Sequence, residues 1–328
     1  MLNFLEKRRQ QFLTEEYYKD RLYYYIEGID GWKESDAFED DQYNCGDDRR
    51  WNLISHDYSF LLYLEYTAGK SIEDITYLFE KLIEAYEKQS EALAIFHKSE
   101  KPSVIVGEGG FIALTIISLA ILLDQNILLK KIEKLINGES GGNFGEDEII
   151  NKFFKLTNSN HPNPEKDGIY SYAYAPLCDV IDNVIFKKNK NHAVELLNDY
   201  LSDWYKIHKN TNWYNSHLDL ENSYEYCGYW AFEAAALVYL LDLDDRSLHK
   251  YLYYPKDIVQ WIRNKKPNQI TKNDSEQVRV AARESCPRSG YWFTVAQENS
   301  RQYFKQGDVF PDFESDWGDV YWQFDGDK

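Results

Sequence analysis

The stretch "GYWAFEAAALVYLLDLDD", residues 228–245, has apolar side chains on every side of a helical wheel through most of its length. A helix that is apolar all round is buried on all sides, so the stretch predicts a central helix, over about 223–243, in an all-α protein. The alanines at 234–236 let neighbouring helices approach closely. Glu233 points into this apolar packing, so its carboxylate must meet an arginine, a histidine or a hydroxyl, or else have a raised pKa.

Two roles for Glu233 follow from this position. The first is a structural carboxylate that ties helices together, which is the reading we favour. The second is a general acid in an all-α carbohydrate-active hydrolase, an enzyme class that combines two carboxylates with aromatic platforms. Asp244 and Asp245 are available as the second carboxylate, but acids are so abundant in this chain that no spacing singles out a pair. For the protein as a whole, a non-catalytic helical scaffold is a further alternative to the hydrolase.

Helical spacing of apolar residues extends outward from this stretch over most of the chain. The expected helices cover about 5–29, 53–67, a long segment from residue 71, 111–123, 170–187, 190–208, and a last helix with Pro255 in its first turn. Residues 30–52 lack periodicity and are rich in Asp and Gly, which predicts an acidic loop. "GYWFTV" and "DVYWQF", near the C-terminus, are typical of short strands. The expected fold is an all-α, multi-helix, bundle-like protein with a small C-terminal β-hairpin or irregular tail.

Turn-forming residues suggest where this chain divides into domains. "NSNHPNPEKDG", 158–168, is the best internal boundary, and "KKPNQITKNDSEQ", 265–277, is a polar linker. We therefore expect an N-terminal helical domain over 1–158, a C-terminal helical domain over 159–265, and a linker with an aromatic and acidic tail over 266–328.

The charge of the chain limits the kinds of partner it can bind. Its formal net charge is −18 and its pI is about 4.9. Nucleic acid and anionic membranes both require a basic face on their protein partner, so neither is expected here. A basic protein is the partner that this charge favours, and homo-oligomerisation is left open.

Other chemistry finds little support in the sequence. The four cysteines lie far apart without a C-x-x-C pair, so we expect free thiols in a reducing cytosol, and the charged N-terminus is unlike a signal peptide. No histidine pair has the spacing of a helical metal site, and "GEGG", 107–110, lacks the ending of a phosphate-binding loop. We expect a cytoplasmic protein without metal or cofactor.

The stretch 229–259 resembles the C-terminal domain of the PoNi family of bacterial immunity proteins. That family shows a Tyr-Trp pair, a Glu followed by alanines, an Asp-Asp pair after the helix, and a segment like Tyr-Pro-x-Asp-Leu. The matching positions are Tyr229, Trp230, Glu233, Ala234, Ala235, Asp244, Asp245, Tyr254, Pro255 and Asp257, and Ile258 replaces the final Leu. Residues 8–30 are similar, more loosely, to the opening helix of the same family. The tail, 286–325, departs from the family and looks like an extension found on other proteins of secreted-toxin loci.

The resemblance implies a non-catalytic protein that neutralises a DNA-cleaving toxin delivered between bacteria, as in type VI secretion, by binding the toxin's nuclease domain. The acidity of the chain agrees with this, because a nuclease presents a basic cleft to DNA phosphates and an acidic surface is steered onto it. We expect toxin contacts from acids in the aperiodic segments, with Asp244 and Asp245 as a second choice. The first group is Asp36, Glu39, Asp40, Asp41, Asp47 and Asp48. Tyr229, Trp230, Glu233, Tyr254 and Pro255 are expected to be structural.

Overall fold

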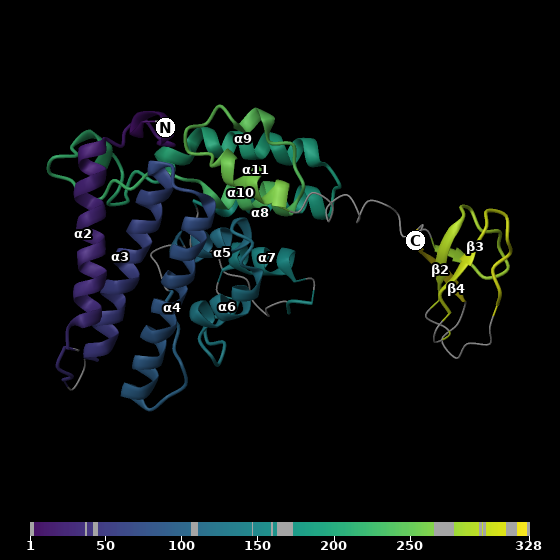
Figure 1. Ribbon diagram of the computed structural model, residues 1–328, viewed down its shortest axis with the longest axis horizontal. Helices are drawn as coiled ribbons and strands as arrows, with labels where there is room; N and C mark the ends of the chain where they lie inside the picture. The colour runs from purple at the N-terminus through teal and green to yellow at the C-terminus, as the bar shows by residue number, and fades with distance from the viewer. Residues whose placement is uncertain are drawn as a thin grey trace. The chain divides into compact units, whose positions relative to one another are not determined.

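The computed structural model describes residues 3–36, 38–41, 45–105, 111–145, 147–158, 160–162, 173–265, 279–294, 297, 300–312 and 320–326. Its contacts divide the chain into two compact units, residues 1–263 and 264–328. We call these the helical unit and the strand unit (Figure 1). The expected fold class, mostly helical with a small C-terminal β element, is confirmed.

Three long helices lie side by side in the N-terminal half of the helical unit (Figure 1). After the short α1 (Phe4–Lys7), they are α2 (Glu15–Glu34), α3 (Gly46–Ala68) and α4 (Ile72–His97). Thr14 and Ser71 cap α2 and α4, because each side chain accepts a hydrogen bond from a backbone N–H of the first turn. Gly69, with a φ of 91°, ends α3 in the left-handed conformation that glycine adopts at low cost.

The core of the helical unit is built around α5 (Phe111–Leu122), in which every residue from Ala113 to Leu122 is buried. Around it are the 3₁₀ turn η2 (Asn126–Leu128), α6 (Leu129–Asn137) and α7 (Glu148–Thr157). Within the described residues, no helix is both long and apolar enough to cross a membrane.

The C-terminal half of the helical unit contains the quoted stretch. Its helices are α8 (Ala175–Ile185), α9 (Lys190–Ile207), α10 (Phe232–Leu240) and α11 (Lys256–Lys265), with the 3₁₀ turns η3 (Ser216–Leu218) and η4 (Arg246–Leu248). The helix α10 packs against α5, and α8 packs against α9. The buried helix predicted from residues 228–245 is therefore present, and its residues from Phe232 to Val238 are all buried.

Three expected boundaries are wrong. The expected helix over 5–29 is interrupted, because residues 8–14 are not helical and separate α1 from α2. The expected helix over 223–243 is helical only from Phe232 to Leu240, because Gly228 has a φ of 112° and the segment before Phe232 is not helical. The apolar pattern of that segment reflects burial, since Tyr226, Tyr229 and Trp230 are all in the core. The expected loop over 30–52 is helical at both ends, because α2 continues to Glu34 and α3 begins at Gly46.

The strand unit contains a four-stranded antiparallel sheet in the order β1-β4-β2-β3. The strands are β1 (Arg279–Ala281), β2 (Gly290–Phe293), β3 (Gln302–Phe304) and β4 (Tyr321–Gly326). The two stretches predicted to be strands contribute β2 and β4, which pair directly. A separate aromatic core is formed by Trp292, Phe304, Phe310 and Trp322.

Candidate functional site

Glu233 lies in the first turn of α10 and joins this helix to α9. Its Oε1 atom accepts a hydrogen bond from the Tyr200 hydroxyl, 2.7 Å away, and another from the indole N–H of Trp204, 2.8 Å away. Tyr200 and Trp204 are four residues apart, so both donors come from one face of α9. Burial raises the pKa of Glu233 to about 7, and the bonds from Tyr200 and Trp204 oppose that rise. The sequence predicted either a hydroxyl or basic partner or a raised pKa for this carboxyl, and the structure shows a hydroxyl partner and a raised pKa together.

The surroundings of Glu233 bear on the hydrolase alternative. A pKa near neutrality suits a general acid, but the side chain must also reach a substrate. Glu233 is only 1% exposed, and its donor Trp204 is itself buried, with its ring stacked on Trp213 and Tyr253. A buried carboxylate that accepts bonds from core side chains fits the predicted structural role, which stays a prediction.

We call the positions within 229–259 that resemble the PoNi family the motif. Its first two residues, Tyr229 and Trp230, bind the N-terminal part of the chain. The side-chain amide of Gln10 donates to the Tyr229 carbonyl at 2.6 Å, and its oxygen accepts from the Tyr229 backbone N–H at 3.0 Å. The Trp230 indole donates to the Thr67 hydroxyl, 2.9 Å away, at the end of α3. These bonds span more than 160 residues of sequence, so they join the motif to the N-terminal part of the helical unit.

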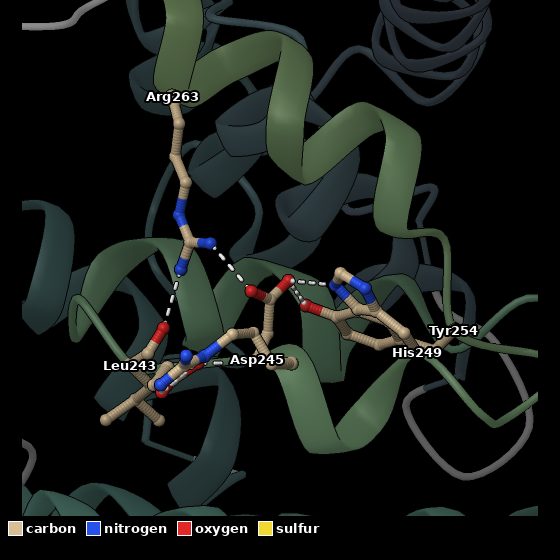
Figure 2. A network of polar contacts seen from close by, with 7 residues as sticks. Leu243, Asp245, His249, Tyr254 and Arg263 are labelled. Atoms are coloured by element: carbon tan, nitrogen blue, oxygen red, sulfur yellow. Dashed lines mark hydrogen bonds and ion pairs between the residues drawn. The ribbon is translucent and has the colours of Figure 1, made fainter.

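Figure 2 shows the polar network around Asp245, which follows α10 and faces the helix α11. Its Oδ1 atom lies 2.8 Å from Nη1 of Arg263, and its Oδ2 atom accepts a hydrogen bond from the Tyr254 hydroxyl at 2.8 Å. The Nε2 atom of His249 lies 3.2 Å from the same Oδ2. Burial opposes ionisation of this carboxyl, but the bonds from Arg263 and Tyr254 outweigh it and hold its pKa below the usual value. Arg263 also donates to the Leu243 carbonyl at 2.6 Å, which fixes the turn between α10 and α11.

Asp257, the last acid of the motif, also forms an ion pair and a hydrogen bond within the protein. Its carboxylate lies 2.5 Å from Nε of Arg9 and accepts a hydrogen bond from the Tyr66 hydroxyl at 2.5 Å. Pro255, just before α11, is buried. Glu233, Asp245 and Asp257 therefore all make contacts inside the protein.

The residues predicted to contact a toxin have different surroundings. Asp36, Glu39, Asp40 and Asp41 are exposed in the segment between α2 and α3, whereas Asp47 and Asp48 are half-buried in the first turn of α3. Asp40 accepts a hydrogen bond from the Gly46 backbone N–H, Asp47 pairs with Arg50, and Asp48 accepts a hydrogen bond from the side-chain amide of Gln89. Asp244 is exposed and bonded to Arg246, and Asp245 is buried. Toxin contact by these residues stays a prediction.

Four partners of the motif residues were not predicted from the sequence, namely Tyr200, Trp204, Arg263 and Gln10. One signal was available for Tyr200 and Trp204, because two hydrogen-bond donors four residues apart stand on one face of the expected helix 190–208. Arg263 and Gln10 had no comparable signal, since each meets the motif only through the tertiary fold. Among the described residues, no cluster of His, Cys, Asp and Glu could hold a metal ion.

Comparison with known proteins supports one family. Residues 145–258 match the family model described as PoNe immunity proteins (PoNi), C-terminal. This match confirms the resemblance to PoNi-type immunity proteins over a segment that contains the Glu233 and Asp245 sites, and it supports an immunity function directed against a nuclease toxin. No curated protein matches the chain.

A solved structure supports the fold. The chain is similar to protein PA2201 from Pseudomonas aeruginosa, with a TM-score of 0.58 and 16% sequence identity, over 79% of this chain and 91% of that one. At this identity the likeness concerns the fold alone.

Proposed function

We propose that this chain is a cytoplasmic immunity protein that binds the nuclease domain of a cognate secreted antibacterial DNase and occludes its active site or its DNA-binding face. The observation that carries the proposal is the family match over residues 145–258. The net charge of −18 supports it, because a DNase has to present positive charge to DNA and an acidic partner is steered onto that face.

The proposed mechanism is stoichiometric binding, without turnover or cofactor. The motif carboxylates favour this reading, since Glu233 and Asp245 are buried and bonded to neighbouring side chains. In our proposal the motif shapes the helical unit, and exposed residues elsewhere contact the toxin. Delivery of that toxin by a type VI secretion system is part of the same proposal.

A co-expression experiment tests the proposal. Cells that produce the toxin encoded beside this chain should lose their DNA and die, and production of the chain in the same cells should restore growth. Cells that carry the same plasmid without the chain are the control. If the folded chain gives no more protection than this control, the immunity proposal is wrong.

A further inference from the structure

The outward face of α2 carries a line of exposed acids with a tyrosine in it. These residues are Glu16, Asp20, Tyr23, Glu27, Asp30 and Glu34. Their spacings alternate between four and three residues, so the turn of about 100° per residue confines all six to an arc of about 80°. The opposite side of the helix packs into the core through Tyr17, Tyr25 and Ile29. Figure 1 shows α2 at the edge of the helical unit, beside α3.

The fold does not account for this line of acids. Within the described part of the chain, Glu16, Glu27, Asp30 and Glu34 have no ion-pair partner. Like charges three or four residues apart destabilise a helix, and Glu34 also lies at the negative end of the helix dipole. The helix α2 does contain one ion pair of its own, between Lys19 and Glu15 at 2.7 Å, but neither residue belongs to the acidic line. An unneutralised acidic line that weakens its own helix is best explained by a partner outside the chain.

Three exposed aromatic side chains lie on or beside this face, with Tyr23 inside the line of acids and Tyr24 and Tyr224 at its edge. Tyr23 is 65% exposed, Tyr24 is 55% exposed, and Tyr224, in the loop before α10, is 56% exposed. The buried guanidinium of Arg21 packs over the rings of Tyr24 and Tyr224, with distances of 4.9 and 4.1 Å to the ring centroids. Arg21 is fixed in turn by its ion pair with Asp20 at 2.6 Å. Two of the three rings are thus ordered before binding, which lowers the entropy lost on association.

We propose that this α2 face, residues 16–34 together with Tyr224, is the surface that docks the nuclease domain of the toxin, with Tyr23 at the centre of the contact and Tyr24 and Tyr224 at its edge. The inference rests on the proposed immunity function. Aromatic residues at the centre with charge around them are the composition of a binding hot spot, and the acids match the basic surface that a nuclease offers to DNA. Asp36 lies two residues after the end of α2, so the face adjoins the acids predicted from the sequence.

The chemistry of this face disfavours other occupants. A second copy of the chain would bring two acidic lines together, which costs energy at an interface. Nucleic acid and anionic membranes would be repelled for the same reason. A basic protein surface is the occupant to which we commit.

Binding kinetics of the full-length chain test the inference, with a catalytically inactive nuclease domain from the neighbouring toxin gene as the probe. The double variant Glu27→Lys, Asp30→Lys should lower the association rate constant at least about 10-fold at low salt, with a smaller effect at high salt. Tyr23→Ala should raise the dissociation rate constant about 30-fold, as expected for a hot-spot tyrosine.

Matched controls separate a local effect from a change in net charge. Asp199→Lys with Asp203→Lys on α9 alters the charge equally, and Phe186→Ala removes an aromatic ring that is 75% exposed. Both controls should bind like the unaltered chain. Helical circular dichroism of every variant checks that the fold is retained.

Several results would overturn the inference while leaving the immunity function intact. In one, the unaltered chain binds and the α2 variants bind equally well. In another, the α9 control is the variant that loses affinity, which places the contact in the family segment. In a third, the α2 variants change only self-association, which makes the face an interface between copies. Failure of the unaltered chain to bind or protect would instead refute the proposed function itself.

Discussion

The carboxylate of Glu233 on α10 lies 2.7 Å from the hydroxyl of Tyr200 on α9, and both side chains are buried. Removal of the acceptor leaves the Tyr200 hydroxyl and the Trp204 indole without a bond in the core. We therefore expect Glu233→Ala to lower the free energy of unfolding by about 3 kcal/mol, from the cavity and the two unsatisfied donors together. Denaturant unfolding followed by circular dichroism measures this loss.

Glu233→Gln is the matched variant, because one amide oxygen can still accept both bonds. It should lose no more than about 1 kcal/mol. Equal losses for the Ala and Gln variants would show that the two hydrogen bonds contribute nothing and that only side-chain volume matters at this site.

The raised pKa of Glu233 predicts a particular dependence of stability on pH. In the folded protein this carboxyl holds its proton up to about pH 7, whereas its ordinary pKa is 4.5. Between these values the folded state binds more protons than the unfolded state, so this group's stabilisation is complete below about pH 4.5 and is lost as pH rises through 7. The stability difference between the unaltered chain and Glu233→Gln should therefore fall from pH 4.5 to pH 8. A difference that stays constant over this range would contradict the raised pKa.

The pair of Asp245 and Arg263 predicts the opposite slope at acid pH. The pKa of Asp245 is below its ordinary value of 3.8, so the stability from its ionised form is present above about pH 4 and is lost as pH falls through the folded-state pKa. Arg263→Ala should cost about 1–2 kcal/mol at pH 6, since the pair is partly exposed, and less at pH 3. Urea unfolding at the two pH values measures the change, and an equal cost at both would argue against the ion pair.

The strand unit should unfold without the helical unit. The ring of Trp322 is buried and stacks on Phe310, with 5.5 Å between the ring centroids. Trp322→Ala should cost the strand unit about 3–5 kcal/mol, which is enough to unfold so small a core, while the thermal midpoint of the helical signal stays unchanged. Trp204→Ala in the helical unit is the converse control. A helical midpoint that falls with Trp322→Ala would show that the two units fold together.

Part of the fold could be predicted from the sequence, because helix positions and burial depend on local patterns of apolar residues. The apolar wheel around Glu233 predicted its burial, and the apolar spacing of residues 53–67 and of the segment from residue 71 predicted the long helices. The start of α3 was missed, although Asp47 and Asp48 are typical of a first helical turn. Residues 30–52 have the aspartates and glycines that are typical of a loop. For this reason the end of α2 and the start of α3 were not predicted.

The partners of the motif residues could not be predicted in the same way. Gln10 meets Tyr229 from 219 residues away, and Arg263 reaches Asp245 only because the turn after α10 places α11 above it. The acidic line of α2 is different, because its spacing was present in the sequence. Its meaning depends on knowing that the other side of the helix is buried and that four of its acids have no ion-pair partner among the described residues.

The central claim is that the chain inhibits a nuclease by binding it one to one. The most direct measurement is a titration of DNA cleavage by the purified nuclease domain of the neighbouring toxin, with increasing amounts of the full-length chain. We predict that cleavage falls linearly and stops at one chain per nuclease, and that activity returns when the complex is dissociated. Cleavage that persists in excess chain, or inactivation by far less than one equivalent, would contradict inhibition by occlusion.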